Sequence, residues 1–229
     1  MKAKLYGIGV GPGDPELLTL KAVKTIQKCE AIAGQKTAFS IVERYISEKQ
    51  LLECRFAMEG GMAKRREARR IAAGQIIAFL ETGRDVGFVT LGDPTTYSTY
   101  MYVHELIEGK GFDAEIIPGV TSYAAAAAAL GIALCENNEA LTIIPAKHSE
   151  SIDALLEMPG NKVIMKSGEN LAYVLEKIKE NDQDAMVACR VGMVGQTLYR
   201  SIDEYNKSPE TGYFTVAIVG EGKKKHEAK

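Results

Sequence analysis

The chain has 229 residues, of which 46% are hydrophobic and 25% charged, and its formal net charge is −2 at pH 7. This composition is ordinary for a globular protein and provides a sizeable core without disulfides or structural metals. The nearly balanced charge does not favour a nucleic-acid partner, and no apolar run approaches the roughly 20 residues that cross a bilayer. The first residues read as a strand rather than a signal peptide, so we expect a cytoplasmic protein.

In the first half of the chain, strand-like and helix-like segments alternate, which predicts an α/β fold. The spacing of Leu20, Val23 and Ile26 is helical, and residues 124–129 are an unbroken alanine run. In chain order, we expect a strand at Lys4–Val10, a helix at Thr19–Glu30, a strand at Ala31–Gly34, a helix at Ala63–Glu81, a strand and turn at Asp85–Pro94, a helix at Ser98–Glu108, and a strand, turn and helix start within Ala114–Tyr123.

The second half repeats the alternation, so the prediction is two α/β domains. We place them at residues 1–119 and 120–229, because one strand ends and a new helix begins near the boundary. The expected strands are Leu141–Pro145, Lys162–Lys166, Ala185–Val191 and Phe214–Val219, and the expected helices are Glu150–Glu157 and Asn170–Lys179.

The cysteines and histidines form no metal-binding pattern. The four cysteines include no CxxC pair, and the three histidines form no HExxH-type cluster. We therefore expect free thiols and no metal site. These residues are Cys29, Cys54, Cys135, Cys189, His104, His148 and His226.

A glycine-rich segment, GIGVGPGDPELLTL, begins at Gly7. Alternating glycines allow tight turns and a close approach of the backbone to a ligand. The dinucleotide pattern G-x-G-x-x-G is nearly met, but its sixth position is Pro12, and Pro15 also favours an irregular loop before any helix. No G-K-[ST] follows, which excludes a P-loop, whereas a nicotinamide or flavin site stays open.

The segment TLGDPTTYSTYMY, Thr90–Tyr102, follows a predicted strand. Ligands of open α/β sheets bind at the carboxyl ends of strands, so this segment is a second candidate site. Asp93 could accept hydrogen bonds from sugar hydroxyls or from a cation. The alternative is a simple turn in which Asp93 caps the following helix.

The segment PGVTSYAAAAAALG places Thr121 and Ser122 at a helix start, where either residue is a natural N-cap. The small alanines let this helix lie close to a sheet, to another helix or to a cofactor. Close packing alone would also explain them.

The run KRREARR, Lys64–Arg70, places Arg65 and Arg69 on one helix face and Arg66 and Arg70 on another. A solvated helix face is the common explanation of such a run, and a patch for a polyanionic substrate is the alternative.

The glycine segment, TLGDPTTYSTY and EIIPGVTSYAAAAAALG together resemble the tetrapyrrole methylases, which use S-adenosylmethionine in siroheme and corrin synthesis. The resemblance extends nearly end to end and includes VIMKSG and FTVAIVGEG. Within the family, GDPTTYSTYMYVHE is similar to the branch that methylates C20 of precorrin-2 or of its cobalt-bearing counterpart.

This resemblance implies two α/β domains that flank a cleft, the class III arrangement, with S-adenosylmethionine folded between them, the tetrapyrrole beside it and a homodimer as the assembly. The cofactor contacts that it implies are Pro12, Leu91, Gly92, Asp93, Thr96, Thr121, Ser122, either Met165 or Lys166, and Gly192.

The same resemblance implies roles in catalysis and substrate binding. Asp93 is the first candidate to stabilise developing positive charge or to accept a proton, and Tyr97 and Tyr100 are second candidates. A tetrapyrrole with a rim of carboxylates needs cations around it. The candidates are Arg55, Arg65, Arg66, Arg69, Lys147 and Arg190.

Three alternatives remain at this point. An NAD(P)-linked oxidoreductase would need an acidic residue about 20 residues after the glycines, and Glu30 lies near that distance but precedes its strand. A second alternative is another substrate within the family, such as a protein in diphthamide formation. A third is a tetrapyrrole-binding protein without catalysis. The presence of cobalt in the substrate is left open.

Overall fold

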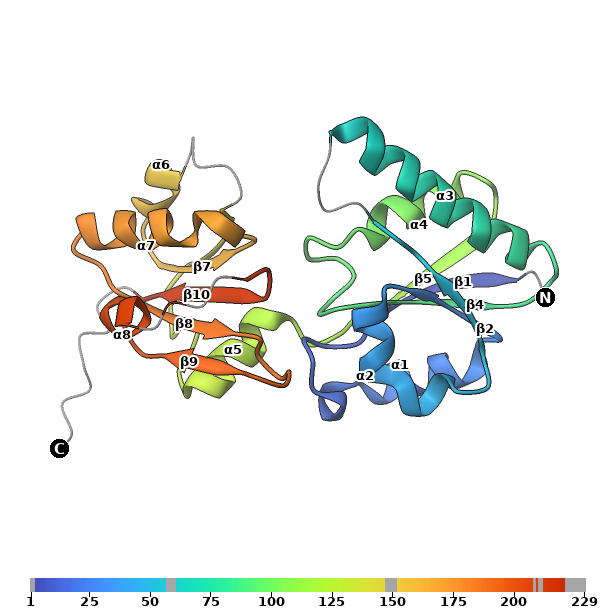
Figure 1. The fold of residues 1–229 in the computed structure, drawn as a ribbon, viewed down its shortest axis with the longest axis horizontal. Coiled ribbons are helices and arrows are strands. Elements are labelled where there is room, and N and C mark those ends of the chain that lie inside the picture. Colours follow the sequence, from blue (N-terminus) through green and yellow to red (C-terminus); the bar gives the residue numbers. More distant parts are fainter. Residues whose placement is uncertain (1–2, 57–60, 147–151, 208, 210–211, 221–229) are drawn as a thin grey trace. The chain divides into compact units, whose positions relative to one another are not determined.

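The computed structural model of the chain describes residues 3–56, 61–146, 152–207, 209 and 212–220 (Figure 1). It divides into two compact units, Met1–Thr121 (unit 1) and Ser122–Lys229 (unit 2). None of the described helices is long and apolar enough to cross a membrane.

Unit 1 is built on a five-stranded sheet in the order β3-β2-β4-β1-β5, in which every neighbouring pair is parallel. The carboxyl ends of all five strands therefore lie at one edge, which we call the carboxyl edge of unit 1. The strands are β1 (Lys4–Gly9), β2 (Ala31–Gly34), β3 (Gln50–Glu53), β4 (Val86–Thr90) and β5 (Asp113–Ile117).

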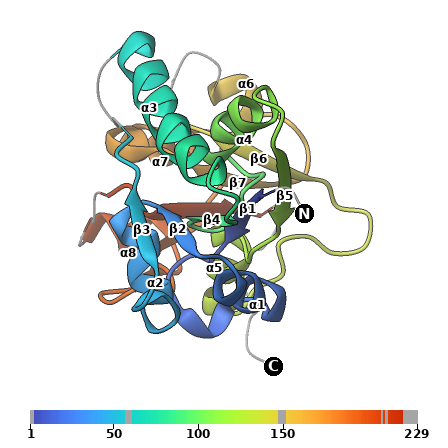
Figure 2. The ribbon, with the colours of Figure 1, turned by 90° about the vertical axis from the view of Figure 1, so that its right-hand side faces the viewer.

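Two helices cover each face of this sheet (Figures 1 and 2). Side chains alternate along β1, so that Leu5 packs on the face under α3 and α4, whereas Ile8 packs on the face under α1 and α2. Both faces are buried, which is expected of a parallel sheet. The helices are α1 (Leu20–Lys28), α2 (Lys36–Ile46), α3 (Met62–Leu80) and α4 (Tyr100–Glu108).

Unit 2 is built on a mixed five-stranded sheet in the order β6-β7-β10-β8-β9. Because β7 and β8 are both antiparallel to β10, they run parallel to each other, and their carboxyl ends share one edge. The strands are β6 (Leu141–Pro145), β7 (Asn161–Met165), β8 (Ala185–Cys189), β9 (Thr197–Tyr199) and β10 (Thr215–Val219).

The alanine-rich helix α5 (Ser122–Leu130) packs on one face of this second sheet through Ala126, Ala127 and Leu130. On the other face lie α6 (Ile152–Leu156), α7 (Leu171–Glu180) and α8 (Ile202–Lys207), whose apolar side chains share a core with that side of the strands. The predicted α/β class is therefore confirmed.

Some elements differ from the sequence-based expectations. No element was expected at α2, β3, β9 or α8, whereas the strand and turn expected at Asp85–Pro94 agree with β4, which ends at Thr90. The strand expected to reach Val191 ends at Cys189, because Arg190 adopts φ 51°, which is incompatible with a strand.

Candidate active site

Three loops leave the carboxyl edge of unit 1: the first loop (10–19) follows β1, the second loop (91–99) follows β4, and the third loop (118–121) follows β5. The strands that carry them are neighbours, since β1 lies between β4 and β5. Parallel pairing thus brings together the three sequence segments that were separate candidates.

Backbone hydrogen bonds join the first loop to the second. The amide of Gly92 donates to the carbonyl of Gly11 at 2.7 Å, and the amide of Gly11 donates back to Gly92 at 3.3 Å. Both glycines have positive φ, 76° and 67°, which other residues rarely adopt. The two loops are therefore held at a fixed spacing by their own backbone.

The second loop and the last residue of β1 also contact the third loop through the backbone atoms of glycine residues. A Cβ atom added to Gly119 would lie 2.3 Å from the carbonyl oxygen of Gly92, and one added to Gly9 would lie 2.6 Å from the amide nitrogen of Gly119. The glycine pattern of the first loop is thus explained by the meeting of three loops, and a phosphate ligand is not needed to account for it.

Asp93 ties the second loop to the third. Its Oδ1 accepts hydrogen bonds from the amide, at 2.8 Å, and from the hydroxyl of Thr95, while its Oδ2 accepts the amide of Gly119 at 3.0 Å. The residue is 8% exposed. Both oxygens are engaged by donors, so the carboxylate is placed to hold the loops together, and the helix that it was expected to cap begins only at Tyr100.

Tyr97 stands out in the second loop, because its φ is 50° and its side chain is 44% exposed. Such a backbone conformation is unusual for a bulky residue and costs about 1–3 kcal/mol, and it tends to occur at functional sites. The loop closes behind it through Ser98, whose hydroxyl lies 2.9 Å from that of Thr90 and accepts the amide of Tyr100 at 3.2 Å.

Tyr100 is buried, unlike Tyr97. Its ring lies over Gly7, where an added Cβ would come within 1.9 Å of the ring, and its hydroxyl lies 2.8 Å from Nδ1 of His104. Burial raises the pKa of the phenol above its ordinary value. A ring with no exposed surface cannot meet a large substrate, so the candidate catalytic role of Tyr100 is replaced by a packing role.

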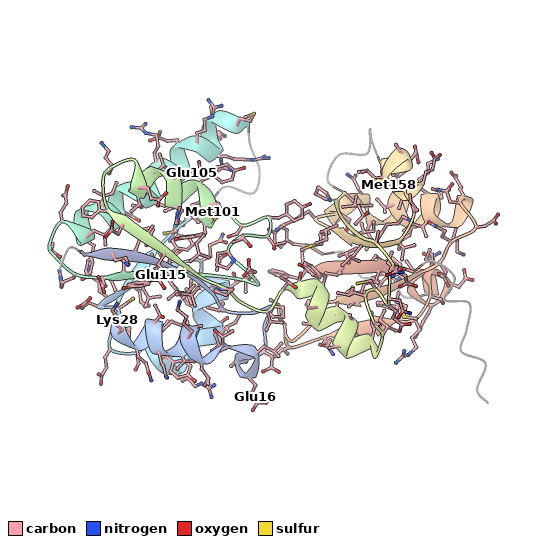
Figure 3. All side chains as sticks on the ribbon, turned by 180° about the vertical axis from the view of Figure 1, so that it is seen from behind. Glu16, Lys28, Met101, Glu105, Glu115 and Met158 are labelled. Atoms are coloured by element: carbon pink, nitrogen blue, oxygen red, sulfur yellow. The ribbon has the colours of Figure 1, made fainter. Side chains whose placement is uncertain are left out.

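The remaining cofactor candidates of unit 1 lie on the same loops. Pro12 and Gly92 are buried, whereas Leu91, Thr96 and Thr121 are partly exposed. None of the three loops contains Lys or Arg. The first loop continues into a short 3-10 helix, Pro15–Leu17, capped by Asp14, and Glu16 of this helix is labelled in Figure 3.

This geometry does not fit a dinucleotide site. A pyrophosphate needs a helix N-terminus directly after the first strand, but α1 begins only at Leu20. Glu30, the acidic residue at the appropriate distance, precedes β2 and accepts the amide of Asp85, so it lies at the opposite edge of the sheet. Loops without Lys or Arg also offer no side-chain cation to a pyrophosphate.

The cations expected to bind substrate differ in their surroundings. Arg55 pairs with Glu53 at 2.9 Å, and Arg70 pairs with Glu67 at 2.9 Å. Arg69 is partly buried and its guanidinium carbon lies 3.5 Å from the ring centroid of Tyr102. Arg65 is also partly buried and Arg66 is exposed, while Lys147 lies outside the described residues.

In unit 2, Lys166 and Arg190 directly follow β7 and β8 at the shared edge, and both have positive φ, 57° and 51°. Lys166 donates to the hydroxyl of Tyr213 at 2.5 Å, and Arg190 Nε donates to the carbonyl of Gly195 at 3.1 Å. Tyr213, which was not predicted as a site residue, precedes β10 at this same edge. The sequence feature that could have identified Tyr213 as a site residue is an aromatic side chain just before a buried strand.

The two other candidates of unit 2 lie close by in the chain. Met165 ends β7 and packs partly into the core beside α5. The amide of Gly192 donates to the side chain of Gln196 at 2.8 Å. Among the described residues, no group of three or more His, Cys, Asp or Glu side chains is arranged to hold a metal ion.

Residues 4–204 match the model of the tetrapyrrole (corrin/porphyrin) methylases, and the chain belongs to this family. It is 31% identical to a probable cobalt-precorrin-2 C(20)-methyltransferase of Methanocaldococcus jannaschii, over 94% of this chain and 95% of that protein. It is 29% identical to a cobalt-precorrin-2 C(20)-methyltransferase of Salmonella typhimurium, over 96% and 97% of the two chains.

A solved structure shows the same fold. It is a uroporphyrin-III C-methyl transferase from Thermus thermophilus, complexed with S-adenyl homocysteine. The match has a TM-score of 0.70 and 19% sequence identity and covers 96% of this chain and 98% of that one.

Proposed function

We propose that this chain transfers a methyl group from S-adenosylmethionine to C20 of precorrin-2 or of its cobalt-bearing counterpart. The observation that carries the proposal is the joining of three loops that contain no Lys or Arg. Loops without a cation suit a sulfonium ligand, and the names of the two relatives supply the position of methylation.

The loops of unit 1 would hold the cofactor. Pro12 and Leu91 offer apolar contact for an adenine ring, and the hydroxyls of Thr96 and Thr121 can hydrogen-bond polar groups of the ligand. The hydroxyl of Ser122, the first residue of α5 in unit 2, can do the same. The amide and carbonyl of Gly92 already bond Gly11, so its part is to let the backbone come close. From unit 2 we propose Met165, Lys166 and Gly192.

When bound, S-adenosylmethionine supplies an electrophilic methyl group. The protein then has mainly to hold the acceptor carbon in line with it, and orientation of this kind can contribute roughly 7–11 kcal/mol. Asp93 contributes by fixing the distance between the second and third loops. Tyr97 is the exposed aromatic residue of the second loop, and we propose that it contacts the tetrapyrrole.

The substrate carboxylates would be bound by cations at the two edges. We propose Arg65, Arg66 and Arg69 of α3, which begins at the carboxyl edge of unit 1, together with Lys147 and Arg190 of unit 2. Arg55 is a weaker candidate, because Glu53 already occupies its guanidinium. The family resemblance also leads us to propose a homodimer, and the cytoplasmic location stays a prediction.

A paired anaerobic assay tests the function. The purified chain and S-adenosylmethionine are given metal-free precorrin-2 or its cobalt complex, and products are identified by mass spectrometry and by the position of the new methyl group. One methyl group added at C20 of either compound supports the proposal and identifies the form used. Methylation at another carbon, or of neither compound, contradicts it.

A binding experiment separates the cofactor classes. Calorimetric titration with S-adenosylhomocysteine should give saturable binding, whereas NAD should give none, because α1 begins too late to receive a pyrophosphate. Binding of NAD alone would contradict the proposal.

A further inference from the structure

The cation–π pair of Arg69 and Tyr102 joins two helices that both begin at the carboxyl edge of unit 1. Tyr102 lies in the first turn of α4, and Arg69 lies about two turns into α3. The guanidinium carbon is 3.5 Å from the ring centroid, which is the distance of a close stack.

Arg69 has no carboxylate partner among the described residues, unlike two other arginines in this part of unit 1. Arg70 is held by Glu67 and Arg55 by Glu53, whereas no described carboxylate lies at ion-pair distance from Arg69. Glu105, which follows Tyr102 by three residues in α4 and is labelled in Figure 3, makes no ion pair with Arg69. One face of the guanidinium therefore lies against the Tyr102 ring, while none of the described carboxylates pairs with its N–H groups.

The position of Tyr102 is not explained by core packing. Its side chain is 49% exposed, and it lies outside the buried clusters that Val103 and Ile107 of the same helix enter. A stacked ring fixes the plane of a guanidinium, so less side-chain freedom is lost when that guanidinium binds a carboxylate. A half-exposed tyrosine whose ring lies against a guanidinium fits the role of a positioning residue.

We propose that Tyr102 positions Arg69 to bind one carboxylate of the tetrapyrrole through a two-pronged pair of hydrogen bonds. This inference rests on the proposed function, since it takes the tetrapyrrole as the ligand of this edge. Arginine is suited to the role because its planar donors match the two oxygens of a carboxylate.

The test is a fluorescence titration with uroporphyrin III, a stable tetrapyrrole with eight carboxylates, alongside KM and kcat for precorrin-2. Arg69→Gln should weaken uroporphyrin binding about tenfold and raise KM by a similar factor, with kcat nearly unchanged. Arg84→Gln is the matched control, because Arg84 also stacks on a ring, Phe79 at 4.2 Å, but precedes β4 at the opposite edge. Its Kd should change less than twofold.

Variants of Tyr102 separate positioning from a merely structural role. Tyr102→Phe keeps the ring and should keep the wild-type Kd, whereas Tyr102→Leu should weaken binding about threefold. In the double variant Arg69→Gln/Tyr102→Leu, the Kd for uroporphyrin III should equal that of Arg69→Gln alone, because Tyr102 acts through Arg69.

The outcomes distinguish this inference from the proposed function. If the wild type methylates precorrin-2 while Arg69→Gln and Arg84→Gln bind uroporphyrin alike, the role of Arg69 is overturned and the function stands. If the wild type methylates neither substrate, the proposed function fails, and the uroporphyrin titration still decides whether Arg69 binds a carboxylate. Additive effects of the two substitutions would overturn the role of Tyr102.

Discussion

At the scale of single residues, Asp93 has a role that the sequence could not reveal. Its proximity to Thr95 is local, and a turn of this kind follows from the sequence GDPT. Its bond to the amide of Gly119 joins positions far apart in the chain, so only the fold brings them together. The carboxylate accepts two backbone amides and the Thr95 hydroxyl, and its contact with a ligand stays a proposal.

Asp93→Asn should therefore weaken the cofactor site rather than remove a proton acceptor. The side-chain nitrogen of asparagine is a donor, and it would face the backbone N–H of either Gly119 or Thr95, which is also a donor. A buried donor without an acceptor costs about 1–3 kcal/mol. We expect a Kd for S-adenosylhomocysteine at least about tenfold higher, measured by calorimetry, and a lower free energy of unfolding in urea.

Asp14→Asn is the matched control, because Asp14 makes a similar local turn with Glu16 in the first loop. It should change the Kd little, since the hydrogen bond that Asp14 accepts from the Glu16 amide lies within the first loop. An unchanged Kd for Asp93→Asn with a large loss of kcat would instead show that Asp93 takes part in the chemistry.

The tyrosines show why residue type alone does not identify a site. Tyr97, Tyr100 and Tyr102 lie within six positions, but only Tyr100 turns inward, because Gly7 leaves room for its ring. A glycine in a buried strand is the sequence feature that could have indicated the contact between Gly7 and Tyr100.

The two arginines Arg55 and Arg69 differ in their spatial neighbours. Arg55 forms an ion pair with Glu53, whereas Arg69 lies against the ring of Tyr102, and comparison of sequence motifs does not show either contact.

At the scale of elements, long segments with regular spacing were predicted well. The expected strand Leu141–Pro145 agrees with β6, and the expected helix Ala63–Glu81 is shifted by one residue from α3. The helix α2 was missed although Ile41, Val42 and Ile46 have helical spacing. The strand β3 has only four residues with little burial, so its pairing with β2 rather than its composition makes it a strand.

The crossing of the three loops gives a prediction for this edge. Gly119→Ala should separate the second and third loops, because the new Cβ would lie 2.3 Å from the Gly92 carbonyl oxygen. We expect a loss of about 1–3 kcal/mol in the free energy of unfolding and weaker binding of S-adenosylhomocysteine. Denaturation in urea and calorimetry measure the two effects.

Gly74→Ala is the matched control, since Gly74 lies exposed within α3 and an added Cβ would meet nothing within 4 Å. Alanine in a helix interior should raise the free energy of unfolding by about 0.5–1 kcal/mol, with binding unchanged. Equal effects of the two substitutions would contradict the close contact at Gly119.

At the scale of the whole molecule, alternation of strands and helices was enough to predict the α/β class, and several spaced motifs were enough to predict the family. The mixed sheet of unit 2 was not predicted, because β9 has three residues and strand direction is set by tertiary pairing. The strand order of unit 1 determines which loops lie next to one another, and it could not be predicted from the sequence.

Two buried thiols predict how stability depends on pH. Burial raises the pKa of Cys29 to about 12 and that of Cys54 to about 11, from an ordinary value of 9.0. Above pH 9 the unfolded chain loses protons that the folded chain keeps, so stability is full below pH 9 and falls as pH rises toward these values. Each thiol contributes a slope of up to about 1.4 kcal/mol per pH unit.

Urea denaturation at pH 7.5, 9 and 10 measures this slope. Cys54→Ala removes one of the two thiols and should make the slope shallower, whatever its effect on the stability at pH 7.5. The same slope in wild type and variant would show that an ionisable group other than Cys54 causes the fall in the free energy of unfolding above pH 9.

The contacts of Gly9 also set an order for folding during synthesis. Strand β1 lies between β4 and β5, and Gly9 touches Gly92 and Gly119, so the first loop cannot reach its final position until both partners have been made. At about 5–20 residues per second, the interval between synthesis of Gly9 and of Gly119 is on the order of 5–20 s. A ribosome-bound chain that ends before β5 therefore carries an exposed β1 edge, and such a nascent chain should need protection from pairing with another chain.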